Sequence, residues 1–230
     1  MKFGSRLFSS SVGKKWIVAL TGLAMIGFLV GHLAGNLLIF LGSEHTNAYA
    51  HFLKSNMELL WGARIGLLVM LILHVYTSIK LSLENKAARP VQYANATPFG
   101  AGLASRYMTL TGITILVFII YHLLHFTFLV EPVNLTGTDF AELHDAEHRH
   151  DVYKMLITGF SQPIIAGFYI LAMLLVSTHV SHAATAVFQS IGVRTVVNKP
   201  LFDKISFALA VIFFLGFSSI PISVLLGIVK

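Results

Sequence analysis

Six histidines lie in long apolar stretches of this sequence. They are His32, His74, His122, His125, His179 and His182. An ionisable side chain at membrane depth is costly unless it has a partner inside the protein, so each of them is a candidate functional residue. Neutral imidazoles from facing helices suit haem iron, because the porphyrin supplies four in-plane nitrogens and the protein supplies the axial ligands. The alternative is that each histidine only forms a hydrogen bond to a neighbouring helix.

The composition indicates an integral membrane protein. The chain has 230 residues, of which 56% are hydrophobic and 11% are charged, and its mean hydropathy is +0.77. The net charge of +6 is spread over short loops between apolar stretches, which indicates membrane topology rather than binding of nucleic acid. The chain contains no cysteine, which excludes disulfides, iron–sulfur ligation and covalent c-type haem attachment to it.

Five apolar stretches have the length of transmembrane helices, which need about 20 residues to cross a bilayer. They cover residues 16–41, 61–83, 107–130, 161–188 and 205–229. No stretch alternates apolar and polar residues as the strands of a membrane barrel do. The sequence therefore predicts an all-α fold, in which residues 1–230 form a single domain of five transmembrane helices in contact with membrane lipid.

The distribution of positive charge predicts the orientation of these helices. Eleven of the 16 Lys and Arg residues fall in the N-terminal segment, in residues 80–106 and in residues 194–204, all on one side of the predicted bundle. The positive-inside rule places this side and the N-terminus in the cytoplasm, which predicts a multi-pass protein of the cell inner membrane. The opposite side carries an acidic loop. Its Asp145, His148 and His150 could bind a metal ion, but a solvated acidic cap is the simpler expectation.

Depth along the helices sorts four of the histidines into two pairs. His32 and His122 each lie eight residues before the outer end of their stretches, which is about 12 Å at 1.5 Å per residue. His74 and His179 lie late in stretches that run inward, so they are nearer the cytoplasm. Two levels of paired imidazoles predict two haem groups, one at each level.

Two further histidines leave choices open. His125 lies three residues after His122, and His182 lies three residues after His179, so each is near the same helix face as its neighbour. Matching depth favours His122 over His125 as a ligand. His182 is expected to bond a haem propionate or to support the ligand His179, and it is the alternative ligand to His179. Glycines near the histidines would leave room for a flat macrocycle. They are Gly27, Gly31, Gly35, Gly112 and Gly167.

The order of one deep histidine in each of the first four of five spans resembles a known family. This is the di-haem cytochrome b membrane subunit of succinate:quinone oxidoreductases, the anchor of respiratory complex II (succinate dehydrogenase) and of fumarate reductases. The local sequences that agree are Gly31-His32-Leu33, Asn47-Ala48-Tyr49-Ala50-His51-Phe52, Thr111-Gly112 leading to His122-Leu123, and His179-Val180-Ser181-His182 leading to Phe188-Gln189-Ser190-Ile191-Gly192. The resemblance implies two haem b groups: His32 and His122 would hold the distal haem iron, and His74 and His179 the proximal one.

The resemblance also implies a function. The subunit would pass electrons between an iron–sulfur subunit and a membrane quinone, expected to be menaquinone, and would anchor the iron–sulfur subunit and a flavoprotein on the cytoplasmic side. It would thus belong to a succinate dehydrogenase or fumarate reductase without carrying the dicarboxylate active site. Proton donors for a reduced quinone are expected near the distal haem, where the candidates are Asn47, His51, Glu58 and Arg64.

Two other functions stay open from the sequence. The cytochrome b of another respiratory oxidoreductase, such as a hydrogenase, commonly carries two histidines per helix, one at each membrane level. A haem-free membrane anchor or transporter would lack the absorption band of reduced low-spin haem b.

Overall fold

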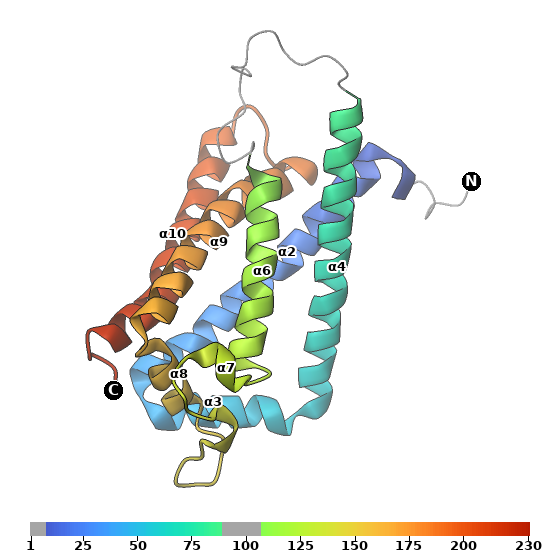
Figure 1. Ribbon diagram of the computed structural model, residues 1–230. Helices are drawn as coiled ribbons and strands as arrows, with labels where there is room; N and C mark the ends of the chain where they lie inside the picture. Colours follow the sequence, from blue (N-terminus) through green and yellow to red (C-terminus); the bar gives the residue numbers. More distant parts are fainter. Residues whose placement is uncertain (1–7, 89–106) are drawn as a thin grey trace. The chain divides into compact units, whose positions relative to one another are not determined.

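The computed structural model of the protein describes residues 8–88 and 107–230. Within these residues the chain is helical, with helices making up 81% of the structure and no strand among the described residues. Figure 1 shows the order of the elements along the chain. Four basic residues that enter the topology argument, Lys2, Arg6, Arg89 and Arg106, lie outside the described residues.

Five long helices are apolar enough to cross a membrane. They are α2 (Ser11–Asn36), which is continued by the 3-10 helix η1 (Leu37–Leu41), α4 (Met57–Ala87), α6 (Met108–Phe126), α9 (Pro163–Ser190) and α10 (Lys199–Leu225). A helix satisfies its backbone hydrogen bonds within itself, which is what a segment in lipid requires. The predicted all-α class with five membrane-spanning helices is confirmed, and the protein is a multi-pass membrane protein.

The helix boundaries differ from the apolar stretches for local reasons. Helix α4 runs four residues further at each end than the predicted 61–83. The extension is Met57-Glu58-Leu59-Leu60 at the N-terminal end and the largely polar Glu84-Asn85-Lys86-Ala87 at the C-terminal end. Helix α6 ends at Phe126 instead of residue 130. There the backbone N–H groups of Phe128 and Val130 bond back to the carbonyls of Leu123 and Leu124. Leu129 adopts a left-handed conformation with φ of 54°, which closes the helix.

Within residues 8–88 and 107–230, four short helices were not predicted from the sequence. They are α3 (Ser43–Ser55), α7 (Glu131–Asn134), η2 (Phe140–Glu142) and α8 (Val152–Phe160). A search for long apolar stretches does not find them, because they are short and, in α3, largely polar. Local capping defines one of them: the Asp151 side chain accepts a hydrogen bond from the backbone N–H of Lys154 at 2.9 Å, at the N-terminus of α8.

The described residues of the chain divide into two compact units, and the single domain stays a prediction. The first unit consists of the described residues within Met1–Phe28, Ile65–Ile113 and Thr178–Ala210. The second consists of Leu29–Arg64, Thr114–Ser177 and Val211–Lys230. The first unit contains His74, His179 and His182, and the second contains His32, His122 and His125.

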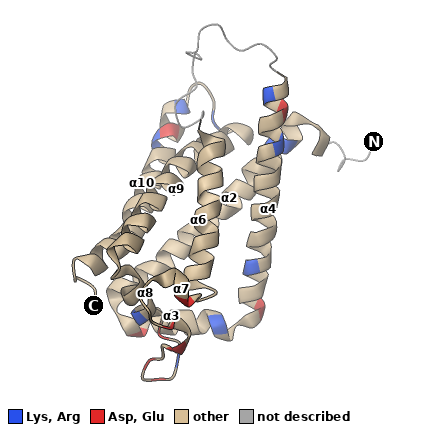
Figure 2. Ribbon diagram, viewed as in Figure 1, with Lys and Arg blue, Asp and Glu red and all other residues tan. Residues whose placement is uncertain are grey.

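The first unit is the more basic of the two. Its described residues include seven Lys or Arg and two carboxylates, whereas the second unit has five and eight. Figure 2 shows these charges on the ribbon. Lys14 of α2 is only 3% exposed and forms an ion pair with Glu84 of α4. Since a buried lysine is costly without a partner, this pair ties α2 to α4.

In the second unit, α3 packs against α8 and η1. Asn47 of α3 is 1% exposed and uses both ends of its side chain. Its Nδ2 donates to Asp151 at 3.0 Å and to Asp145 at 3.3 Å, and its Oδ1 accepts from the backbone N–H of Tyr153 at 3.0 Å. Asn47 thereby joins α3 to the loop that precedes α8 and to the first turn of that helix.

Candidate functional site

His32 and His122 lie close together in the second unit. Their ring centroids are 5.9 Å apart and their ring planes are inclined at 87°. An imidazole nitrogen lies about 2 Å from a bound transition metal, so two imidazoles on opposite sides of one metal ion have centroids about 6 Å apart. The separation of His32 and His122 therefore fits a single iron between them. Both side chains are only partly buried.

His122 has a hydroxyl partner at its other ring nitrogen. The Tyr169 hydroxyl lies 3.4 Å from His122 Nδ1 and 3.0 Å from His125 Nδ1. With a metal on Nε2 of His122, its Nδ1 carries the proton and donates to the Tyr169 oxygen, which then donates to His125. Metal-binding histidines are commonly oriented by such a partner.

His125 occupies a different environment from His122. It is completely buried, stacks on Phe126 at a centroid distance of 3.9 Å and lies 5.8 Å from the Phe140 ring. Its Nε2 is buried and has no hydrogen-bond partner. The two histidines that the sequence left as alternatives are thus distinguished by their contacts, because His122 lies against His32 while His125 is enclosed by aromatic rings.

In the first unit, His74 is held by the pair Thr21 and Gly22 of α2. The Thr21 hydroxyl lies 3.1 Å from His74 Nδ1. The same hydroxyl lies 2.6 Å from the carbonyl of Ile17, and when it donates to that carbonyl its oxygen accepts a proton from His74 Nδ1. In that tautomer Nε2 of His74 carries the lone pair that a metal needs. A Cβ added to Gly22 would lie 3.3 Å from His74 Cε1, so glycine lets the ring approach the helix closely.

His179 has the same surroundings on α6. The Thr111 hydroxyl lies 3.2 Å from His179 Nδ1 and donates to the carbonyl of Met108 at 3.0 Å. A Cβ added to Gly112 would lie 3.4 Å from His179 Cε1. His179 also lies within range of electrostatic interaction with His74 and with His182. His74 and His179 are each partly buried, and each has Nδ1 engaged by a threonine.

The glycines predicted to make room for a macrocycle fall into two groups. A Cβ added to Gly27, Gly31 or Gly167 would meet no atom within 4 Å, so these positions border open space. Gly35 borders no such space, because the Tyr49 ring would lie 2.6 Å from its added Cβ. The His179 ring occupies the space next to Gly112, where Cε1 of the ring would lie 3.4 Å from an added Cβ. The last two glycines allow close packing and leave no room for a ring.

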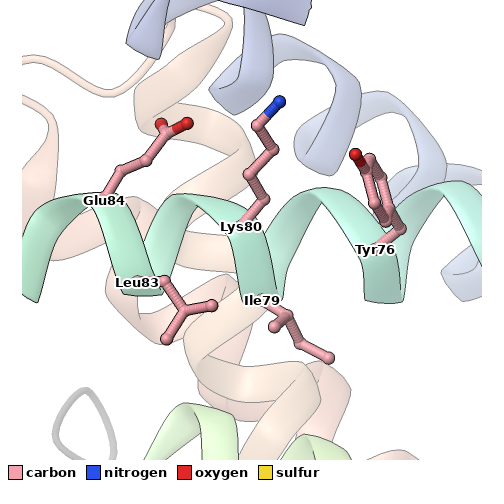
Figure 3. A pocket seen from close by; sticks show the side chains of 5 residues that line it. All are labelled: Tyr76, Ile79, Lys80, Leu83 and Glu84. Atoms are coloured by element: carbon pink, nitrogen blue, oxygen red, sulfur yellow. The ribbon is translucent and has the colours of Figure 1, made fainter.

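The first unit contains a groove on α4, formed by residues that follow His74 in the sequence. It is lined by Tyr76, Ile79, Lys80, Leu83 and Glu84. Figure 3 shows Tyr76, Lys80 and Glu84 on one side of α4 and Ile79 and Leu83 on the other. The ammonium group of Lys80 lies 6.0 Å from the centre of the Tyr76 ring. Lys80 is a cation of the kind that pairs with a haem carboxylate.

The four predicted quinone-binding residues all belong to the second unit. The side chain of Asn47 is buried and its hydrogen-bonding groups are occupied within the protein. His51, Glu58 and Arg64 are exposed, on α3 and on the first two turns of α4. The guanidinium of Arg64 lies 5.2 Å from the centre of the Trp61 ring. The structure thus gives Asn47 a structural role, while the other three residues stay predictions.

The acidic loop is organised by Arg149. This side chain donates to both carboxylate oxygens of Glu44, at 2.7 and 3.1 Å, and to Asp145 at 2.7 Å. The hydrogen bonds from Arg149 lower the pKa of Glu44, and the bonds to Glu44 and Asp145 raise the pKa of Arg149. Among the described residues, no group of three or more His, Asp or Glu side chains is placed to hold a metal ion. Ion pairs with Arg149 thus join this loop to α3, while Glu142, Glu147 and His148 of the loop are exposed, as a solvated acidic cap requires.

Sequence reasoning missed the hydroxyl groups that contact the histidines. These residues are Thr21, Thr111 and Tyr169. A signal existed for the two threonines: Leu20-Thr21-Gly22 is repeated as Leu110-Thr111-Gly112, and in both cases a paired histidine, His32 or His122, follows the threonine by eleven residues. No comparable signal marks Tyr169, which is one of seven tyrosines.

No protein-family model, curated protein or solved structure matches this chain. The functional proposal therefore depends on the chemistry of the site itself.

Proposed function

We propose that this protein is the di-haem cytochrome b membrane subunit of a succinate:quinone oxidoreductase. His32 and His122 would hold the iron of the distal haem b, and His74 and His179 that of the proximal haem b. When bound, the two haems would supply one-electron chemistry between a cytoplasmic iron–sulfur subunit and a membrane quinone such as menaquinone. The flavoprotein of the complex would carry the dicarboxylate active site. The N-terminus would lie in the cytoplasm.

The observation that carries this proposal is the pairing of the histidines. One unit brings together His32 and His122 with ring centroids 5.9 Å apart, which fits one metal ion between two imidazoles. The other unit contains His74 and His179, each bound at Nδ1 by a threonine. An apolar interior with paired imidazoles and no cysteine suits b-type haem, which is held by axial ligands alone.

The residues around the histidines have defined tasks in this proposal. Thr21, Thr111 and Tyr169 lie within hydrogen-bond distance of Nδ1 of three imidazoles. They would orient these rings and hold the proton on Nδ1, which would leave Nε2 available to bind iron. Gly27 and Gly31 border open space on α2 that a side chain would fill. The apolar helices exclude water, and the low dielectric of their surroundings influences the reduction potential of a buried metal centre.

A visible spectrum of the purified protein tests the haem content. We expect protein from haem-replete cells to show the sharp band of reduced low-spin haem b with two haems per chain. Replacing His32 or His74 by alanine should remove one haem each and leave the other. Protein that contains no haem, or that keeps both haems in the His32 and His74 variants, would contradict the proposal.

The identity of the complex needs a separate experiment. Affinity purification of the tagged chain from membranes of its source should bring down a flavoprotein and an iron–sulfur protein. The purified complex should then reduce a menaquinone analogue with succinate, or oxidise the reduced analogue with fumarate. Two haems without a flavoprotein partner would instead indicate the cytochrome b of another respiratory oxidoreductase.

A further inference from the structure

Two threonine–glycine pairs contact histidines of the first unit in the same way. Thr21 Oγ1 lies 3.1 Å from His74 Nδ1, and Thr111 Oγ1 lies 3.2 Å from His179 Nδ1. The glycine that follows each threonine faces the same ring: an added Cβ would lie 3.3 Å from Cε1 of His74 at Gly22, and 3.4 Å from Cε1 of His179 at Gly112. Each pair thus contacts one edge of an imidazole, the edge formed by Nδ1 and Cε1.

A carbonyl of the same helix lies within hydrogen-bond distance of each threonine hydroxyl. For Thr21 it is that of Ile17 at 2.6 Å, and for Thr111 that of Met108 at 3.0 Å. When a hydroxyl donates its one proton to that carbonyl, its oxygen accepts from the histidine, and the imidazole then carries its proton on Nδ1 and its lone pair on Nε2. A metal bound at Nε2 requires this tautomer.

The sequence contains this arrangement twice at the same spacing. His32 follows Thr21, and His122 follows Thr111, by eleven residues, which is about three turns of an α-helix. The tripeptide alone is not sufficient, because Leu135-Thr136-Gly137 occurs in a loop and no histidine lies eleven residues after Thr136. Helices α2 and α6 thus share a pattern in which each provides one histidine and holds a second histidine from another helix.

We propose that Thr21-Gly22 and Thr111-Gly112 are two matching seats that fix the orientation and tautomer of His74 and His179 for binding one haem iron. The inference depends on the proposed function for the identity of the metal group. The four residues are positioning residues, since they contact the ligands and not the metal. A hydrogen bond from Nδ1–H makes an imidazole more basic, so the seats stabilise the oxidised iron and lower the reduction potential of this haem.

The test removes the hydroxyls and keeps the shape of the side chains. Thr21→Val, Thr111→Val and the double variant are compared with Thr21→Ser and Thr111→Ser, which keep the hydroxyl. Thr185→Val is the matched control, because the Thr185 hydroxyl also donates to a carbonyl of its own helix, that of Ser181 at 3.1 Å. Haem content, a redox titration monitored by absorbance and the EPR spectrum of the oxidised protein are recorded for each variant.

We expect each valine variant to shift the midpoint potential of one haem upward and to weaken the binding of that haem by about 10- to 100-fold. The double variant should shift the same haem further and leave the other haem unchanged. The serine variants should restore both properties, and Thr185→Val should match the unaltered protein. Equal shifts of the midpoint potentials of both haems, no shift, or no recovery in the serine variants would refute the role of the two threonines. The proposed two-haem function would still hold in that case.

Two further outcomes separate the remaining explanations. If the valine variants cannot be purified, Gly22→Ala is compared with Gly66→Ala, whose added Cβ meets no atom within 4 Å. The alanine at position 22 should change the EPR signal of one haem only, and identical signals in both alanine variants would refute the seat at His74. An unaltered protein without haem would refute the proposed function, and with it this inference.

Discussion

Replacing Tyr169 by phenylalanine tests whether His122 is oriented as a metal ligand. The substitution removes one hydroxyl, which lies 3.4 Å from His122 Nδ1 and 3.0 Å from His125 Nδ1. It keeps the aromatic ring, which packs against Phe160 at 5.0 Å. The change therefore affects the hydrogen bonds of the partly buried His122 and the buried His125 and leaves most of the packing in place.

The size of the effect follows from the value of one hydrogen bond. A hydrogen bond contributes about 0.5–1.5 kcal/mol net. A tenfold change in the equilibrium constant of a one-electron couple corresponds to about 59 mV, so a bond present in one oxidation state only is worth about 20–60 mV. In the proposed function, a hydrogen bond donated by Nδ1 of His122 would favour the oxidised iron. We therefore expect Tyr169→Phe to raise the midpoint potential of the distal haem by up to about 60 mV and to leave the proximal haem unchanged.

A redox titration of the purified protein measures both potentials in one sample. Tyr121→Phe is the matched control, because the Tyr121 hydroxyl donates to the carbonyl of Val133 and its ring belongs to the same aromatic cluster as Tyr169. Tyr121→Phe should leave both potentials unchanged. A shift of the proximal haem, or the same shift in both phenylalanine variants, would refute the role of Tyr169 at His122.

Three further predictions concern the second unit. Asn47→Leu should destabilise the junction of α3 and α8 by about 2–4 kcal/mol, because it removes the bonds to Asp151 and Tyr153 and the longer bond to Asp145. Hydrogen exchange of α8 measures this. Hydrogen bonds from Arg149 lower the pKa of Glu44 below its usual 4.5. The stabilisation of the loop by this pair should therefore be complete above pH 4.5 and should be lost as the pH falls through the lowered pKa of Glu44. Protease sensitivity of residues 143–151 measures this loss. Gly35→Ala should cost about 1–3 kcal/mol in thermal unfolding, since its Cβ would lie 2.6 Å from the Tyr49 ring.

Each of these predictions has a control and an opposing outcome. Asn56→Leu should not change exchange in α8, because the exposed Asn56 bonds the Phe52 carbonyl of its own helix and Ser55 beside it. Arg149→Gln should leave the loop protease-sensitive at every pH, and a loop that still becomes sensitive only in acid would contradict the ion-pair explanation. Gly62→Ala adds a Cβ with no atom within 4 Å. An equal loss of stability at positions 35 and 62 would mean that crowding against the tyrosine is not the cause.

Much of the architecture could be predicted from hydropathy alone. A segment that crosses lipid must be long, apolar and internally hydrogen-bonded, so its composition largely determines that it is a helix and roughly where it lies. The five long helices follow from this rule. The short helices α3, α7 and α8 do not, because their positions depend on caps and on contacts such as those of Asn47 with the loop before α8.

The sequence by itself determined the membrane class, because a segment that crosses lipid must be long and apolar. It also predicts which histidines lie at matching depths, because helix length converts residue number into depth. Only the tertiary structure decided how the histidines are surrounded. It placed His122 against His32, enclosed His125 among aromatic rings, and brought threonine hydroxyls to His74 and His179. Depth gives only the position of a residue across the membrane. A ligand site also depends on the rotation of each helix about its axis and on side chains from other helices. The order of residues along one helix does not specify either of these.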